Sequence, residues 1–156
     1  MTAPRPAGDF VLRAMERGDV AGVAAIEAAA FPRPWTESAF QHELDVPFSR
    51  ALIAHPAGDR DTIAGYLVLW HVADEVHLLD LAVAPGFRRR GLGRALAESV
   101  ITHAREAGAR LVTLEVATTN AAARALYEGL GFVATELRRD YYAPGEDAVA
   151  MVLEVP

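Results

Sequence analysis

The chain has 156 residues and a formal net charge of −6, with 52% hydrophobic and 23% charged residues. This length and composition predict one folded globular domain and exclude a disordered chain. Cysteine is absent, which excludes disulfides, thiolate metal sites and a cysteine nucleophile. All 15 basic residues are arginine because lysine is absent too. Schiff-base chemistry and a phosphate loop of the Walker type are therefore excluded.

The surplus of acidic over basic residues disfavours a protein that holds a nucleic-acid backbone and favours a basic partner. The N-terminus lacks the apolar segment of a signal peptide, and the longest apolar stretch, Val20–Phe31, is too short to span a bilayer. The sequence therefore predicts a cytoplasmic protein that binds neither nucleic acid nor membrane. Residues 1–9 are expected to be mobile, and the domain is expected to cover residues 10–156.

Hydrophobic spacing, helix caps and turn residues predict eleven elements along the chain. The first is a strand, and an alanine-rich helix with Asp19 as its N-cap follows. A shorter helix begins at Thr36. In chain order the predicted elements are strand Phe10–Arg13, helix Val20–Ala30, helix Thr36–Leu44, strands Arg50–His55, Thr62–Val72 and Val76–Val83, helix Gly91–Glu106, strand Arg110–Val116, helix Asn120–Leu130, and strands Phe132–Tyr142 and Ala148–Leu153.

This order predicts one α/β domain with a mixed sheet. Antiparallel strands dominate its first half, and strand-helix-strand crossovers follow in the second. A crossover through a helix joins parallel neighbours, so a parallel pair is expected between Val76–Val83 and Arg110–Val116. Ligands tend to bind where such a sheet changes its topology.

A glycine- and arginine-rich turn lies between a predicted strand and a predicted helix. The glycines permit close approach of a ligand to the backbone, the first helical N–H groups point at an anion, and arginine binds phosphate oxygens. The alternative is a solvated basic cap, but the helix dipole disfavours cations at this end. The turn lacks the glycine pattern of dinucleotide sites and the lysine of a phosphate loop, which favours another pyrophosphate ligand. Its residues are Arg88, Arg89, Arg90, Gly91, Leu92, Gly93 and Arg94.

With the preceding strand Leu79–Val83, this turn resembles the acetyl-coenzyme A (acetyl-CoA) motif of the GCN5-related N-acetyltransferases (GNAT). The resemblance covers Val11–Leu153 and implies a GNAT-like fold, with acetyl-CoA as cosubstrate contacting this turn and Leu81, Ala82 and Val83. Further segments resemble the RimI branch, the ribosomal-protein N-terminal alanine acetyltransferases. These are Pro34-Trp35-Thr36, Leu114-Glu115-Val116, Thr119-Asn120, Leu126-Tyr127-Glu128, Gly131-Phe132, Arg138-Arg139-Asp140-Tyr141-Tyr142 and Glu146-Asp147-Ala148.

Glu115 is a carboxylate in an otherwise mostly apolar predicted strand. Burial of an unpaired charge is costly, so the residue needs a function or a wet position at the end of the strand. Burial is expected to raise its pKa. The resemblance implies that Glu115 is the general base that removes a proton from the amine.

Tyr127 lies in a predicted helix about two turns after Asn120, on nearly the same face. From the residues alone, Tyr127 is either a core aromatic or a functional phenol, and Asn120 is either an N-cap or a ligand contact. The resemblance implies that Tyr127 protonates the departing thiolate and that Asn120 contacts the pantetheine arm of the coenzyme.

Asp80 is the second candidate base. Alternation places it on one face of its strand with Val76, Leu78 and Ala82, whereas His77 falls on the other face and is expected to be structural. The remaining histidines have no ligand spacing, so no metal is expected.

By resemblance, Trp35, Tyr141 and Tyr142 flank the entrance of a peptide, and Ala117 stands where the RimI branch more often has arginine. The expected function is acetylation of the N-terminal alanine of a ribosomal protein by direct transfer in a ternary complex. The alternatives are acetylation of a small amine or a lysine side chain, and a non-catalytic acyl-CoA binding module. The presence of both Glu115 and Tyr127 favours an enzyme.

Overall fold

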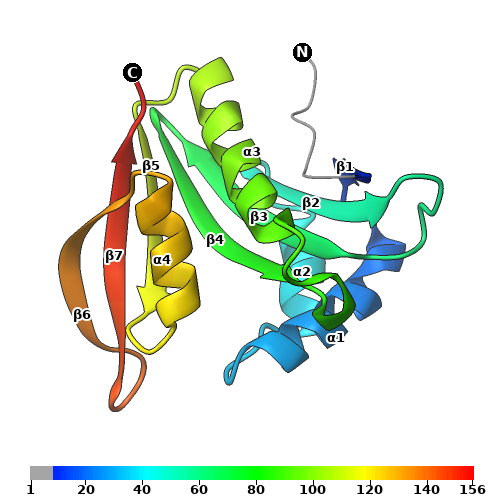
Figure 1. Ribbon diagram of the computed structural model, residues 1–156, viewed down its shortest axis with the longest axis horizontal. Coiled ribbons are helices and arrows are strands. Elements are labelled where there is room, and N and C mark those ends of the chain that lie inside the picture. The colour runs from blue at the N-terminus through cyan, green and yellow to red at the C-terminus, as the bar shows by residue number, and fades with distance from the viewer. Residues whose placement is uncertain (1–8) are drawn as a thin grey trace.

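A computed structural model describes residues 9–156, so residues 1–8 of the predicted mobile segment 1–9 lie outside the described part of the chain. A seven-stranded mixed sheet forms the centre of the molecule (Figure 1). Helices α1 and α2 pack on one face, and α3 and α4 pack on the other. The strands are β1 (Phe10–Ala14), β2 (Ser49–Pro56), β3 (Gly65–Val72), β4 (Glu75–Val83), β5 (Leu111–Ala117), β6 (Val133–Ala143) and β7 (Glu146–Glu154). The helices are α1 (Val20–Ala30), α2 (Glu37–Glu43), α3 (Leu92–Glu106) and α4 (Ala121–Gly129), with 3₁₀ turns at Arg17–Asp19 and Pro85–Phe87.

The sheet order is β1-β2-β3-β4-β5-β7-β6, and β4 pairs with β5 in parallel while the other neighbours are antiparallel. The predicted fold class, element order and parallel pair are therefore confirmed. The parallel ladder runs only from Glu75 opposite Leu111 to Leu78 opposite Leu114. Beyond it, β4 and β5 diverge, as the ribbons in Figure 1 show.

A β-bulge at Leu79 changes the face of the sheet on which the following side chains of β4 lie. Leu78 lies opposite Leu69, whereas Asp80 lies opposite Val68, so Leu79 is the extra residue. Leu69 and Leu78 belong to the core beneath α3, and Val68 belongs to the core beneath α1 and α2. The prediction that one face carries Asp80 together with Val76 and Leu78 is therefore wrong, because the extra residue reverses the alternation. Asp80 is turned toward the α1 side.

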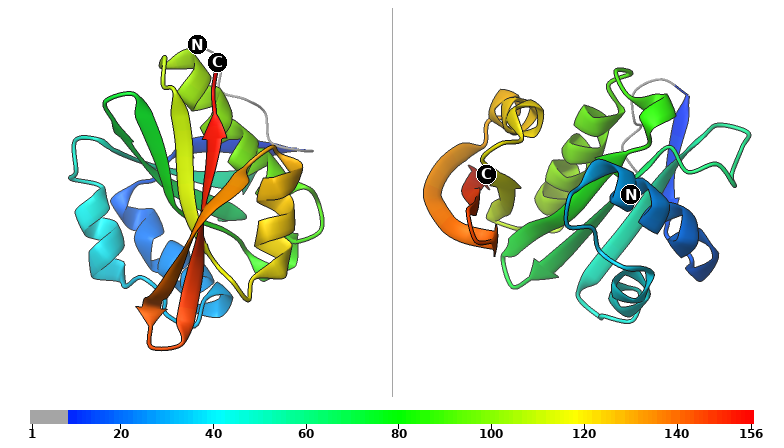
Figure 2. Two further views of the ribbon diagram at one scale, coloured as in Figure 1. Left: turned by 90° about the vertical axis from the view of Figure 1, so that its left-hand side faces the viewer. Right: turned by 90° about the horizontal axis from the view of Figure 1, so that it is seen from below.

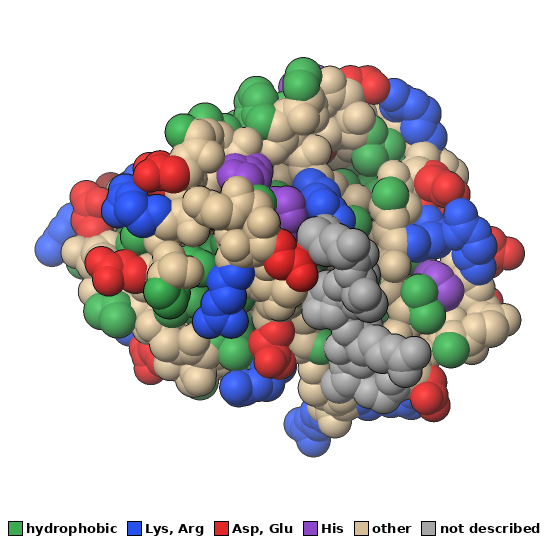
Figure 3. All heavy atoms as spheres, turned by 90° about the horizontal axis from the view of Figure 1, so that it is seen from above, with side chains coloured by type: hydrophobic (Ala, Val, Ile, Leu, Met, Phe, Trp, Pro, Cys, Tyr) green, Lys and Arg blue, Asp and Glu red, His purple; other side chains and the backbone are tan. Residues whose placement is uncertain are grey.

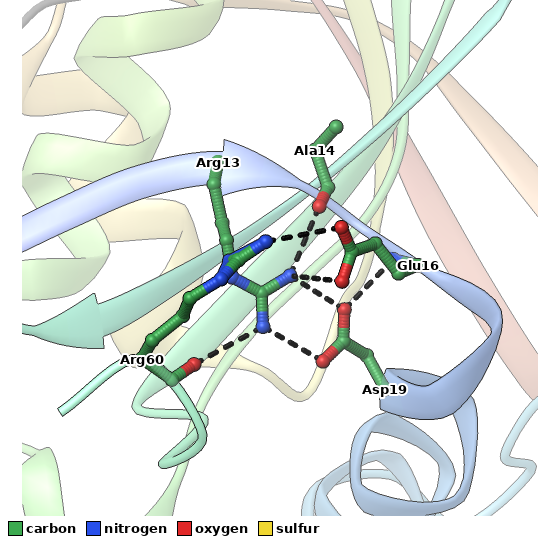
Figure 4. A network of polar contacts seen from close by, with 5 residues as sticks. All are labelled: Arg13, Ala14, Glu16, Asp19 and Arg60. Carbon is green, nitrogen blue, oxygen red and sulfur yellow. Dashed lines mark hydrogen bonds and ion pairs between the residues drawn. The ribbon is translucent and has the colours of Figure 1, made fainter.

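The start of α1 is tied to β1 by an ion pair. Asp19 is the residue before α1, as predicted, but its side chain makes no cap hydrogen bond. Its carboxylate instead accepts from Arg13 Nη1 at 2.7 Å and Nη2 at 2.8 Å, and from the Glu16 N–H at 2.7 Å (Figure 4). This network fixes where α1 begins relative to β1.

Thr36 is the N-cap of α2, and Asn120 is the N-cap of α4. Thr36 Oγ1 accepts from the Ala39 N–H, and Asn120 Oδ1 accepts from the Ala123 N–H, both at 3.1 Å. Each oxygen partners an N–H of a first helical turn.

Acidic and basic side chains are interspersed over the face in Figure 3. Within residues 9–156, no helix combines the length and the apolar character needed to cross a membrane.

Candidate active site

A cavity of about 650 Å³ opens where β4 and β5 diverge. Residues from both faces of the sheet line it, because the missing ladder leaves a gap between the strands. Figure 2 shows from two sides how the helices flank these strands. The α1 side contributes Glu27, Phe31 and Trp35, the strands contribute Asp80, Leu81, Ala82, Val83 and Glu115, and the other side contributes Gly93, Asn120, Leu126 and Tyr127.

Glu115 lies on β5 and lines the cavity. Its neighbours Leu114 and Val116 point into the core beneath α3, so alternation turns Glu115 to the opposite face. There the Glu115 carboxylate contacts His77 Nε2 at 2.8 Å and accepts from the Tyr141 hydroxyl at 3.1 Å. The carboxylate is thus held between two polar side chains.

The hydrogen bond with His77 lowers the pKa of Glu115, and the Tyr141 hydrogen bond acts in the same direction. The prediction that burial raises the pKa of Glu115 is wrong. Burial does act upward, but the interactions with His77 outweigh it. Glu115 is therefore ionised at neutral pH.

His77 was expected to be structural, but it is the direct partner of Glu115. The parallel register sets His77 beside Thr113, and Glu115 follows Thr113 on the same face. The register of the predicted parallel pair is the signal that could have identified this contact from the sequence.

Tyr127 is both a core aromatic and a cavity residue. It is 7% exposed and packs edge-on against Phe132, with ring centroids 5.7 Å apart. Burial raises the pKa of Tyr127, and the nearby Asp80 adds to the effect. The phenol is therefore protonated over the physiological pH range. Asn120, which caps the same helix, also lines the cavity.

The turn before α3 contains two residues in the left-handed region, Arg89 at φ 65° and Gly91 at φ 77°. Gly91 is the N-cap of α3, so a side chain at this position would strain the backbone. A Cβ on Gly93 would come no closer than 3.7 Å to Val83 Cγ2. Gly93 therefore leaves room at the cavity wall that the protein does not fill.

The structure divides the predicted phosphate-binding residues into two groups. Arg88 and Gly93 line the cavity, and Arg88 Nε donates to the Val83 carbonyl at 3.3 Å. The Arg90 guanidinium lies 5.3 Å from the centre of the Phe87 ring. The predicted residues that are not in the cavity lining are Arg89, Arg90, Gly91, Leu92 and Arg94. The Leu92 side chain is buried in the core, so only its backbone is available to a ligand.

The residues expected at a peptide entrance lie near the α1 end of the cavity. Trp35 lines it and donates its backbone N–H to Glu27 Oε2 at 3.1 Å. Tyr142 lines it as well, and burial raises the pKa of this phenol to about 12. Tyr141 reaches the site through its bond to Glu115.

The arrangement offers an ionised carboxylate on one side of the sheet and a neutral phenol on the other, facing one cavity. Such a pair can accept a proton from one reactant and donate a proton to another. Within residues 9–156, no three histidine, aspartate or glutamate side chains gather in a way that could hold a metal ion.

Comparison with known proteins finds relatives that match most of the chain. Residues 20–132 match the model of the acetyltransferase (GNAT) family. The ribosomal protein bS18-alanine N-acetyltransferase of Escherichia coli K12 is 34% identical over 147 residues, which is 92% of this chain and 97% of that protein. The N-alpha-acetyltransferase RimI of Mycobacterium tuberculosis is 36% identical over 147 residues, 88% of each chain. The crystal structure of the Escherichia coli S18-alanine enzyme superposes with a TM-score of 0.84, at 34% identity over 94% of each chain.

Proposed function

Because this chain belongs to the GNAT family of N-acetyltransferases, we propose that it moves acetyl from acetyl-CoA to the N-terminal alanine of a ribosomal protein. The relative from Escherichia coli is named for this alanine of bS18, which supports the choice of substrate. One observation carries the proposal. A single cavity reaches both faces of the sheet, with Glu115 on the α1 side and Tyr127 on the α4 side.

The coenzyme is assigned to the side of α3 and α4. The first-turn N–H groups of α3 lack helical partners and suit the pyrophosphate, and Arg88 supplies charge beside them. Gly93 leaves room for the chain of the coenzyme, which then runs along Leu81–Val83 and past Asn120. These residues line the same cavity, and this supports acetyl-CoA as their ligand.

The acceptor amine is assigned to the α1 side, near Glu115 and Trp35. The amine nitrogen attacks the thioester carbonyl carbon, a C–N bond forms and the C–S bond breaks. The nitrogen becomes strongly acidic as it gains its new bond, so an ionised Glu115 of low pKa can accept its proton. His77 and Tyr141 hold the carboxylate in place for this step.

Tyr127 gives its proton to the departing thiolate. Its raised pKa keeps the phenol neutral until the thiolate forms, and its position on the other side of the sheet separates it from Glu115. The proton taken up on one side and the proton released on the other balance the reaction.

The net charge of −6 suits a basic protein tail as acceptor. An α-amino group has a pKa of about 7.7–8.0 and a lysine amine one of about 10.4. A free α-amine is therefore much easier to generate at neutral pH, and a base as weak as Glu115 favours it.

The deciding experiment uses a peptide with a free N-terminal alanine and an internal lysine, and a matched peptide with its terminus blocked. We expect mass spectrometry to locate acetyl at the terminus of the first peptide, and the blocked peptide not to react. Acetyl mainly on lysine would overturn the substrate class but keep the acetyltransferase. Absence of transfer to any amine, with acetyl-CoA still bound, would instead indicate a binding module.

A further inference from the structure

Glu27 is a buried carboxylate on the floor of the cavity, 2% exposed. Its Oε1 accepts from the Tyr66 hydroxyl at 2.6 Å, and its Oε2 accepts from the Trp35 N–H at 3.1 Å. No arginine or histidine within residues 9–156 forms a salt bridge with it. The donors that these two hydrogen bonds bring to Glu27 are therefore neutral groups.

Asp80 is a second buried carboxyl group beside Glu27, 8% exposed and also in the cavity lining. The bulge at Leu79 turns it to this side of the sheet. Its Oδ2 is buried and finds no donor in the described part of the chain. A buried acceptor without a hydrogen-bond partner is costly. The protonation states of Glu27 and Asp80 must therefore account for the unpartnered oxygen.

One proton shared between the two carboxyl groups supplies the hydrogen-bond partner that Asp80 lacks. Two adjacent carboxylates cannot both ionise cheaply in a buried site. Glu27 already receives two donors, which favours its ionised form, so the proton belongs on Asp80. Burial, followed by Glu27, raises the pKa of Asp80 well above that of an ordinary aspartate. Asp80–H can then donate to Glu27.

We propose that Asp80 is a neutral positioning residue whose proton holds Glu27, and that Glu27 in turn holds the Trp35 segment at the acceptor end of the cavity. The assignment of this end to a peptide rests on the proposed function. The hydrogen bonds that Glu27 accepts from Tyr66 and Trp35 do not depend on that function.

Loss of this proton would break the arrangement. The titratable groups around Asp80 are Glu27 from α1, Tyr66 from β3, Tyr127 from α4 and Tyr142 from β6. All are acids, so none offers a positive charge to an ionised Asp80. At alkaline pH the two carboxylates repel each other, and the bond from Glu27 to the Trp35 backbone is weakened. The acceptor should then bind less well, while the coenzyme side is unaffected.

This role differs from that of a general base, because a base must be ionised at the working pH. Asp80→Asn separates the two roles, since an amide donates to Glu27 as Asp80–H does but cannot accept a proton. Asp80→Ala removes the donor. Tyr66→Phe is the matched control, because it removes a different donor to Glu27 and leaves Asp80 in place.

The experiment measures peptide KM, kcat and the Kd of acetyl-CoA for these variants between pH 6 and 10. For Asp80→Ala we expect about a tenfold higher peptide KM with little change in coenzyme Kd. Asp80→Asn should bring KM back to within about threefold of the parent and should lack the alkaline rise in KM. If Asp80→Asn instead loses kcat as severely as Asp80→Ala, Asp80 acts as a base and the proposal is overturned.

Two readouts are independent of catalysis. The chain has two tryptophans, so a Trp70→Phe background reports the Trp35 environment by fluorescence, and its emission should change in Asp80→Ala and recover in Asp80→Asn. Infrared difference spectroscopy at neutral pH should show a protonated carboxylic acid band that Asp80→Asn removes. Absence of that band overturns the proposal even if Asp80→Ala does not fold. If no peptide is acetylated but the band and emission behave as stated, the proposed function fails and the Asp80 assignment stands.

Discussion

Arg33 and Glu146 are 113 positions apart in the chain, yet the Arg33 guanidinium donates to Glu146 Oε2 from Nη2 at 2.8 Å and from Nε at 3.0 Å. Both residues line the cavity, one from the segment after α1 and the other from the start of β7. The pair joins the two segments at the end of the cavity to which the proposed function assigns the acceptor.

Arg33→Ala should raise the peptide KM by about threefold and leave the melting temperature nearly unchanged, because exposed ion pairs contribute little to stability. The difference should shrink in high salt, which screens the pair in the parent enzyme. The double exchange Arg33→Glu with Glu146→Arg should recover the parent KM. No recovery would mean that Arg33 contacts the substrate itself.

Gly91→Val should weaken acetyl-CoA binding by at least tenfold in calorimetry, about 1.4 kcal/mol. The reason is the left-handed backbone at Gly91, which a β-branched residue adopts only with strain. Gly58→Val is the control, since Gly58 has φ 82° in the turn between β2 and β3 and is not in the turn before α3. Equal loss of coenzyme binding in both variants would contradict the assignment of the turn.

Glu115→Gln and Tyr127→Phe should each lower kcat by about 10²–10⁴ while coenzyme binding is largely kept. Each variant removes one proton transfer but keeps the shape of the side chain. Tyr141→Phe should be milder, because His77 still holds Glu115. Full turnover of Glu115→Gln would show that the base is elsewhere.

The acidic limb of the pH profile of kcat/KM should reflect the pKa of the substrate amine and not that of Glu115. Because the pKa of Glu115 is lowered, this group stays ionised throughout the neutral range. The limb should therefore have an apparent pKa of about 7.7–8.0, that of a peptide α-amine. A peptide whose first residue has a less basic amine should move the limb down by the same amount. A limb that ignores the peptide would point to an enzyme group.

Asp80→Asn should change how stability depends on pH. The pKa of Asp80 is raised on folding, so between about pH 3.9, the unfolded value, and the raised value the folded state binds more protons. Its stability must then fall as pH rises through that window. Relative to the parent, the variant should gain stability from pH 4 to pH 9 in urea denaturation, by about 1.4 kcal/mol for each pH unit in which folded Asp80 keeps a proton that the unfolded chain has lost. Parallel stability curves would show that Asp80 titrates normally.

The order and type of the elements were predictable because they depend on local signals. Periodic apolar residues define α3, and Thr36 and Asn120 satisfy first-turn N–H groups. The change of face along β4 was not predictable, because the bulge at Leu79 can be recognised only from the pairing of β4 with β3. Alternation therefore gave Asp80 the wrong face.

Within the candidate site, the residue types were easier to predict than their ionisation. The sequence marks Glu115 as an unusual carboxylate, but the direction of its pKa depends on His77 and Tyr141, which come from other strands. Likewise Glu27 carries no local signal, since a glutamate in an alanine-rich helix is ordinarily solvated. Its importance comes from Tyr66, 39 positions away.

Because the ladder between β4 and β5 is short, the part of the sheet formed by β1 to β4 and the part formed by β5 to β7 are weakly joined at one end. Past Leu78, the facing edges of the two strands have no ladder to each other, so their peptide groups are available to a third chain-like molecule. A ligand with amide groups can occupy that place as a strand would, and bridge the edges by hydrogen bonds. Filling the gap would then close the sheet, so the protein without its coenzyme should open first along this seam and exchange its β4 and β5 amide hydrogens fastest there.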